Sequence, residues 1–313
     1  MKNKKAAAGA ADRMESRQFC LLSILNGFCG MLPLFRNAGA DTKSAASMTE
    51  NFGRERITHM LEEIISIVRE AGGLVLAARD VSARTHEKTS AADLVTEYDI
   101  AVENFLRERL LALLPEAVFF GEEEAGPADP GKGWAFIVDP IDGTANFVRG
   151  LQQSAISVGL ARDGAVEYGV VYDPYKDEMF SAKRGGGAFL NGAPIHVSGK
   201  PLSEGIFAMG TALYRREYFQ PTMRLTQQLF ARSCDFRRMG AAALDLCAVA
   251  CGRVEVFFEY SLCPWDYAAG SLLITEAGGA VCTLEGEALP VVRRCGVWAS
   301  NRVNRDVLGE LEI

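Results

Sequence analysis

The chain has 313 residues, of which 49% are hydrophobic and 23% are charged. This length and apolar content can bury a sizeable core in one large domain or two closely joined domains, which excludes a disordered chain. The formal net charge of -7, without a basic stripe, argues against a general nucleic-acid binder, because phosphate backbones are held chiefly by Lys and Arg. An anionic substrate would therefore be received by a few local basic or backbone donors, or by bound cations.

The first fifty residues differ from the rest, and we divide the chain into an N-terminal extension, residues 1–50, and a catalytic domain, residues 51–313. An apolar stretch at residues 19–35 follows several basic residues and precedes Ala38-Gly39-Ala40, which is the outline of a secretory signal. Met48, however, opens a polar lead-in to an amphipathic helix, so an upstream extension or a miscalled start explains the segment equally well. The stretch is too short and interrupted to predict stable membrane insertion.

Two helices and two strands are expected in the first part of the main domain. Apolar residues at helical spacing predict a surface helix over residues 54–78. A second helix is expected over residues 100–114, and Pro115 marks its end. Apolar runs at residues 117–120 and 134–138 predict two buried strands.

The second half of the chain alternates between short strands and helices. Strands at residues 154–160, 165–172 and 178–182, separated by turns, predict an antiparallel meander. The mixture of elements beyond it predicts a layered α/β fold class. The remaining helices are expected at residues 218–231, 241–251 and 264–277, and the remaining strands at residues 254–258 and 297–300.

The eight cysteines contain no Cys-x-x-Cys pair, which argues against a zinc ribbon. Cys247 and Cys251 share a helix face, but their neighbours are apolar, so buried free thiols are the favoured interpretation. Scattered thiols in a chain of this length suit a reducing compartment, which predicts a cytoplasmic protein.

Acidic residues end or follow several of the expected strands, at positions where α/β folds gather ligand sites. Each acid alone has a structural explanation: Asp142-Gly143 is a good turn, the glutamates after Gly121 could be solvated, and Asp266 could cap a helix. The acids concerned are Asp93, Asp99, Glu122, Glu123, Asp139, Asp142 and Asp266.

The segment from Asp139 to Thr144 combines two carboxylates around a proline with Gly and Thr, whose backbone N–H groups can be presented to a ligand. Such a segment can hold a cation and a phosphate together, and oxygen ligands select Mg²⁺ or Mn²⁺ over zinc. None of the three histidines lies near these acids, which argues against a histidine nucleophile, base or zinc ligand. Gly185-Gly186-Gly187 lacks the Lys-Ser/Thr of a phosphate-binding P-loop and is expected to form a turn.

Three separated segments resemble the signature motifs of the inositol monophosphatase family. Residues 88–96, Asn191-Gly192 and residues 276–279 also match that family, so the resemblance covers roughly residues 57–313. It implies a layered αβαβα sandwich of the inositol monophosphatase and fructose-1,6-bisphosphatase type. The three segments are Gly121-Glu122-Glu123, Asp139-Pro140-Ile141-Asp142-Gly143-Thr144 and Trp265-Asp266-Tyr267-Ala268-Ala269-Gly270.

The resemblance implies a set of metal ligands. Glu122, Asp139 and the carbonyl of Ile141 would hold a first, activating Mg²⁺, and Asp139, Asp142 and Asp266 would hold a second. Glu122 would also help to hold a weaker third ion, and Mn²⁺ is the expected substitute. Lithium sensitivity, through replacement of Mg²⁺ at the second site, and a homodimer are implied in the same way.

The resemblance also implies which residues act in catalysis and in substrate binding. Thr144, paired with Asp99, would orient the attacking water, and Glu122 would act through the activating metal. The reaction would be a direct in-line displacement at phosphorus, without a phosphoenzyme. The implied substrate contacts are Asp142, Gly143, Thr144, Thr211, Ala242, Glu259 and Asp266, whereas Trp265 is expected to be a packing anchor.

The expected substrate is a small phosphorylated polyol or sugar, and hydrolysis of inositol monophosphate to inositol and phosphate is the expected reaction. Asn146-Phe147 after the aspartate segment resembles the monophosphatase branch. Fructose 1,6-bisphosphate, 3′-phosphoadenosine 5′-phosphate, histidinol phosphate and NADP remain alternatives, since the metal motifs cannot discriminate among these esters. A regulatory binding protein with a secondary phosphatase activity is the alternative from a different class.

Overall fold

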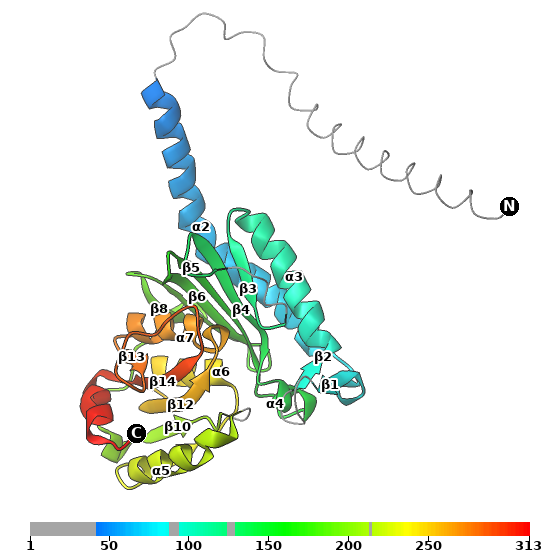
Figure 1. The fold of residues 1–313 in the computed structure, drawn as a ribbon. Helices are drawn as coiled ribbons and strands as arrows, with labels where there is room; N and C mark the ends of the chain where they lie inside the picture. The colour runs from blue at the N-terminus through cyan, green and yellow to red at the C-terminus, as the bar shows by residue number, and fades with distance from the viewer. Residues whose placement is uncertain (1–41, 88–93, 124–128, 213–214) are drawn as a thin grey trace, which may run out of the picture. The chain divides into compact units, whose positions relative to one another are not determined.

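The computed structural model describes residues 42–87, 94–123, 129–212 and 215–313, with side chains described from residue 59 onward (Figure 1). The chain divides into two compact units, Met1–Ile57 and Thr58–Ile313. The signal-like segment and Asp93 lie outside the described residues. No helix in the described part of the chain is long and apolar enough to cross a membrane.

The outer helices of the second unit bury their apolar faces against one sheet. Helix α2 (Thr42–Ala77) begins twelve residues before the expected start, and the predicted domain boundary at residues 50 and 51 falls within it. Helix α3 (Glu97–Leu113) begins with Thr96 and Asp99 in a capping box, in which each side chain accepts the backbone N–H of the other. Buried residues of both helices, such as Val68 and Leu106, form one core cluster with the sheet.

The sheet beneath these helices has seven strands in the order β3-β4-β5-β6-β7-β8-β9. Strands β3 and β4 run parallel, and all later neighbours are antiparallel. The expected meander is therefore confirmed, with a further hairpin that was too short to predict. The strands are β3 (Val118–Gly121), β4 (Trp134–Asp142), β5 (Ala155–Arg162), β6 (Ala165–Asp173), β7 (Glu178–Lys183), β8 (Gly187–Leu190) and β9 (Ala193–Pro194).

A second helical layer, α6 (Ala242–Ala250) and α7 (Pro264–Glu276), lies between this sheet and the next one (Figure 1). Both helices are apolar on almost every side, as expected for helices that are covered by a sheet on each face. Close packing of α7 on β6 requires Gly169, because a Cβ there would lie 2.7 Å from the carbonyl oxygen of Ala269. The helices thus bring their N-termini to a fixed place beside β4.

The second sheet has five strands in the order β11-β10-β12-β14-β13, and its outer face packs on α5 (Phe219–Phe230). Phe257 of β12 faces the middle helices, while Val256 and Phe258 face α5, which follows the alternation of side chains along a strand. The strands are β10 (Ile206–Met209), β11 (Asp235–Arg237), β12 (Val256–Leu262), β13 (Ala280–Thr283) and β14 (Cys295–Ser300).

The resulting order of layers is helix, sheet, helix, sheet, helix, which is the αβαβα sandwich that the family resemblance implies. Small elements complete the described chain: β1 (Thr85–Glu87) pairs with β2 (Leu94–Thr96), and α4 (Thr144–Val148) follows β4. Short 3-10 segments lie at Val81–Arg84, Leu202–Glu204, Arg216–Tyr218 and Arg302–Glu310. All six cysteines among the described residues are free; Cys247 is buried, as expected, whereas Cys251 is only half-buried.

Two local expectations are refined by the structure. Strand β4 was predicted over residues 134–138, but it continues to Asp142 with an irregular register against β5, so the first part of the aspartate segment is a strand end rather than a turn. The expected glycine turn is present: Gly185 and Gly186 lie in the turn between β7 and β8, and Gly187 begins β8. The amides of Gly185 and Gly187 donate to the two oxygens of Glu276, at 2.8 and 2.9 Å.

Candidate active site and metal centre

The first two acids of the site are placed by an irregularity at the end of β4. The register with β5 shifts between Asp139 and Asp142, so both carboxylates leave the strand at neighbouring positions. The Asp139 carboxylate accepts the backbone N–H of Ile141 at 3.0 Å, which closes a tight local loop over Pro140. Because proline has no N–H, Pro140 adds no competing donor there.

The Asp142 carboxylate is held by the N-terminus of α6. Its two oxygens accept the backbone N–H groups of Ala242, at 3.2 Å, and Ala243, at 2.8 Å. The first N–H groups of a helix have no partner within the helix, and they favour a negative charge. Ala242, implied as a substrate contact, therefore orients Asp142 through its amide and also lines the cavity of the site.

Asp266 is held in a similar way at the start of α7. Its side chain accepts the backbone N–H of Cys263 at 2.7 Å, three residues earlier, as part of a capping box. Pro264 occupies the first helical position, where its missing N–H costs nothing. The helix cap that explains Asp266 structurally therefore also fixes its carboxylate toward β4.

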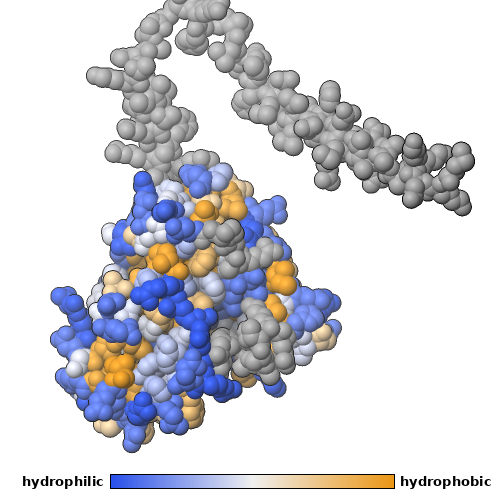
Figure 2. All heavy atoms as spheres, in the orientation of Figure 1, coloured by the Kyte–Doolittle hydropathy of each residue, from blue (hydrophilic) through white to orange (hydrophobic). Residues whose placement is uncertain are grey.

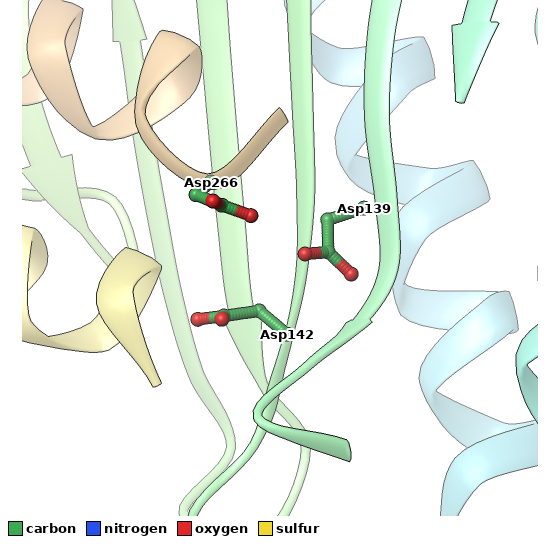
Figure 3. Close-up of side chains that lie close together, drawn as sticks. All are labelled: Asp139, Asp142 and Asp266. Atoms are coloured by element: carbon green, nitrogen blue, oxygen red, sulfur yellow. The ribbon is translucent and has the colours of Figure 1, made fainter. Parts of the chain in front are cut away.

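These three elements bring Asp139, Asp142 and Asp266 together, with one oxygen from each lying within 4.8 Å of the others (Figure 3). Asp139 and Asp142 are buried and Asp266 is half-buried. Burial raises the pKa of Asp142 to about 7 and that of Asp139 well above its ordinary value, and neighbouring carboxylates add to both shifts. Because carboxylates at this spacing repel one another, a bound cation would stabilise their charged forms. Their oxygen-only ligand set fits Mg²⁺ or Mn²⁺.

Glu122 follows β3 and lines the same cavity as the three aspartates. It is half-buried, and its charge raises the pKa of Asp139, Asp142 and Asp266. Trp265, which precedes Asp266, packs against the end of β3, with its ring centroid 5.4 Å from that of Phe120. Its carbonyl accepts the hydroxyl of Ser157, so Trp265 packs as expected and also lines the cavity.

Gly143 and Thr144 form the turn into α4, beside the aspartates. Gly143 has a φ of 85°, in the left-handed region that glycine adopts without strain. The Thr144 hydroxyl lies 3.4 Å from Asp99 and 3.2 Å from the carbonyl oxygen of Ile141, to either of which it can donate. The implied pairing of Thr144 with Asp99 is thus present, and Asp99 is buried beneath it as part of the α3 cap.

The cavity has a volume of about 520 Å³ and extends from the aspartates to β12, α6 and the loop after β10. Glu259 of β12 lies in its wall, half-buried, and accepts the backbone N–H of Ala212 at 2.8 Å. Burial raises the pKa of Glu259 to about 7, while Arg238 and Arg294 counteract the shift. The part of the cavity around Glu259 is therefore polar.

Several residues of this polar half were not predicted from the sequence. Thr211 was expected as a contact; its neighbours Gly210 and Ala212 line the cavity, and its hydroxyl lies 3.3 Å from a guanidinium nitrogen of Arg238. Asp245 is the one charged residue in the apolar run of residues 241–251, a signal that could have been recognised. The missed residues in the cavity wall are Arg215, Arg238, Asp245, Ser261, Cys263 and Arg294.

Comparisons with known proteins agree with this arrangement. The model of the inositol monophosphatase family matches residues 57–311. Nus factor SuhB of Escherichia coli K12 is 37% identical over 229 residues, which cover 72% of this chain and 86% of that protein. The inositol-1-monophosphatase of Rhizobium meliloti is 41% identical over 203 residues, 64% of this chain and 76% of that protein.

A solved structure of inositol monophosphatase II from Staphylococcus aureus, with inositol monophosphate bound, superposes with a TM-score of 0.67 at 28% identity. The match covers 78% of this chain and 90% of that one. The family match spans both sheets and all three helical layers, and the three signature segments lie on the elements that gather the aspartates. On these grounds the chain belongs to the inositol monophosphatase family.

Proposed function

We propose that this protein is a Mg²⁺-dependent phosphatase that hydrolyses inositol monophosphate to inositol and phosphate. The observation that carries the proposal is the convergence of three aspartates from β4 and α7 on one point of a cavity. Glu122, Asp139 and the Ile141 carbonyl would hold one ion, and Asp139, Asp142 and Asp266 another. Glu122 would also contribute to a weaker third ion.

Bound Mg²⁺ supplies the Lewis acidity that activates water and neutralises the phosphate oxygens. The chain positions the reactants. The Thr144 hydroxyl, donating to Asp99 or to the Ile141 carbonyl, keeps its lone pairs for a proton of the attacking water. The amides of Gly143 and Thr144 hold phosphate oxygens, so that water attacks phosphorus as the bond from phosphorus to the alcohol oxygen breaks on the opposite side. Of the two protons of the water, one ends on the departing alcohol oxygen and the other stays with the phosphate.

The alcohol would occupy the polar half of the cavity. Glu259 is fixed there by the amide of Ala212, so its remaining lone pairs can accept hydrogen bonds from hydroxyl groups. Names of relatives support a polyol: one is an inositol-1-monophosphatase, and a solved relative holds inositol monophosphate.

A substrate panel tests the proposal. Phosphate release with Mg²⁺ would be measured from myo-inositol 1-phosphate, fructose 1,6-bisphosphate, 3′-phosphoadenosine 5′-phosphate, histidinol phosphate and NADP. We expect the highest kcat/KM for the inositol ester. A clear preference for a nucleotide bisphosphate would contradict the substrate assignment, while absence of hydrolysis of every ester would contradict the phosphatase itself.

A regulatory role is the second candidate, and the observation that favours it is the name of a 37% identical relative, a Nus factor. The two roles separate with one variant. Asp139→Asn is expected to remove phosphatase activity, so a regulatory partner that binds this variant as tightly as the wild type would establish a second role. The partner to test first is the transcription machinery of the source cell.

Three further expectations follow from family membership and stay predictions. Lithium should inhibit by competing with Mg²⁺ at the second site, which a matrix of both ions would reveal. A homodimer is expected in sedimentation experiments. A cytoplasmic location is expected if the native chain starts near Met48, and mass spectrometry of the native N-terminus checks this start.

A further inference from the structure

Asp245, in the first half of α6, is a buried carboxyl group that the chemistry described above does not use. Asp245 is one of the residues that line the cavity, yet only 1% of its surface is exposed. One of its oxygens, Oδ1, is fully buried and has no hydrogen-bond partner among the described residues. A buried acceptor without a partner costs free energy, so such an atom in a cavity wall indicates a ligand that supplies the missing donor.

A purely structural role for Asp245 is poorly supported by its surroundings. The N-terminal amides of α6 are already taken by Asp142, which accepts from Ala242 and Ala243. Asp245 caps none of these groups, and its own amide donates to the carbonyl of Ala241, as in any helix. The rest of α6 is apolar, so a hydrophobic residue would have served packing better.

The charged groups that act on Asp245 come from β12, from the end of β4 and from the loop after β11. Glu259 of β12 acts on it most strongly and raises its pKa together with burial; Asp142 adds to the shift, and Arg238 counteracts it. No ion pair joins Asp245 to Arg238 within the described part of the chain. The polar half of the cavity therefore presents two neighbouring carboxyl groups, Asp245 and Glu259.

We propose that Asp245 is an additional substrate-contact residue, which accepts a hydrogen bond from a hydroxyl of the leaving alcohol next to the hydroxyl held by Glu259. This inference rests on the proposed phosphatase function and deepens it, since it names the leaving group as a polyol with adjacent hydroxyls. An alcohol without hydroxyls would leave Oδ1 without its partner.

The test compares two esters, myo-inositol 1-phosphate and p-nitrophenyl phosphate, whose leaving group carries no additional hydroxyl. Asp245→Ala is expected to lower kcat/KM for the inositol ester about tenfold, mainly through KM, because one hydrogen bond to substrate is lost. The kcat/KM for p-nitrophenyl phosphate should stay within about twofold of the wild type. Asp245→Asn, which keeps one oxygen acceptor, should recover part of the loss.

Leu244→Ala is the structural control, because Leu244 is buried on the same helix and does not line the cavity. It should change both esters by the same factor. Equal losses on both esters in the Asp245 variants, or no loss on the inositol ester, would overturn the inference. If Asp245→Ala does not fold, Asp245→Asn decides by the same criterion. Failure of the proposed function appears separately, as a wild-type protein that hydrolyses neither ester.

Discussion

Gly143 is the residue whose backbone most directly controls the position of Thr144. Its φ of 85° is unfavourable for other residues, and an added Cβ would lie 3.0 Å from the carbonyl oxygen of Gln153 and 3.1 Å from that of Gly240. Both neighbours are backbone atoms, which cannot move aside as a flexible side chain would. Strain and crowding therefore fall on the turn that carries the proposed water-orienting hydroxyl.

We predict that Gly143→Ala lowers the free energy of unfolding by about 1–3 kcal/mol and reduces kcat at least about tenfold. Gly150→Ala is a matched control, because Gly150 also has a positive φ, 66°, but a Cβ there meets nothing within 4 Å. The control should lose some stability and keep its activity. Urea denaturation and phosphate release measure both quantities, and an active Gly143→Ala enzyme would show that this turn is not critical.

At the scale of single residues, the sequence motifs predicted the acids of the site, although each acid considered alone did not indicate a site. Asp266 had a structural explanation as a helix cap, and the structure shows that this explanation holds along with convergence at the site. Asp142 was explained as a turn residue, but it ends β4 and its carboxylate accepts amides of α6. No single acid could reveal that these carboxylates lie close together in the folded protein. Asp245 went unrecognised because periodicity assigns residues 241–251 to a buried helix, in which one acid looks like an exception.

Among the elements, α6 connects the two halves of the cavity. Its first amides hold Asp142 on the metal side, and Asp245 faces Glu259 on the alcohol side. A substitution that keeps the helix but removes one of these backbone N–H donors would therefore separate the structural role of α6 from its role in positioning Asp142. Ala242 is suitable, because it is the first helical residue and Ala241 before it is already extended, with a φ of -139° and a ψ of 103°.

We predict that Ala242→Pro keeps the fold and weakens Mg²⁺ binding about tenfold or more. Proline has no N–H to donate to the Asp142 carboxylate, so this carboxylate loses one of the groups that position it. Proline is accepted at the first helical position, and an extended residue before it is compatible with the ring. Circular dichroism and the Mg²⁺ dependence of activity check this. Unchanged Mg²⁺ dependence would show that the α6 amide does not position a metal ligand.

The long elements were predictable and the short ones were not. Helices α3, α5, α6 and α7 were expected within three residues of their observed ends, because each carries a clear period, cap or stop signal. Strands such as β1, β9 and β11 have only two or three residues, too few for any period. Their positions depend on pairing with distant strands, which no local pattern encodes.

On the scale of the whole molecule, the acid cluster links stability to pH and to the metal. The folded protein without metal keeps protons on Asp142 up to about pH 7, and on Asp139 and Asp266 also above their ordinary range. The unfolded chain has released these protons by about pH 5, so it binds fewer protons than the folded chain. Stability without metal must therefore fall as the pH rises from about 5 to about 8.

We predict that Tm in EDTA is lower at about pH 8 than at about pH 5.5 by at least about 3 °C. Mg²⁺ should raise Tm most at the higher pH, because it replaces the protons that the carboxylates have lost. Asp142→Asn removes one titrating group and should flatten the dependence in EDTA. A Tm in EDTA that rises over this range would contradict the assignment of raised pKa values to the cluster.

The layered architecture was predicted from the family resemblance, not from composition or periodicity, which alone indicated only a mixed α/β fold. The physical reason is that sheet order depends on contacts between distant segments, such as β10 with β12. The metal side of the site could be predicted because its ligands are confined to short motifs. The alcohol side could not, since its wall is assembled from β12, α6 and the loop after β10.

The most direct test of the account is Mg²⁺-dependent phosphate release from myo-inositol 1-phosphate by the wild type and by Asp139→Asn. We predict turnover by the wild type that EDTA abolishes, and a loss of at least about a thousandfold in Asp139→Asn with its Tm retained. Asp163→Asn, in the exposed turn between β5 and β6, is the control and should behave as the wild type. Near-normal turnover by a folded Asp139→Asn protein would contradict the account.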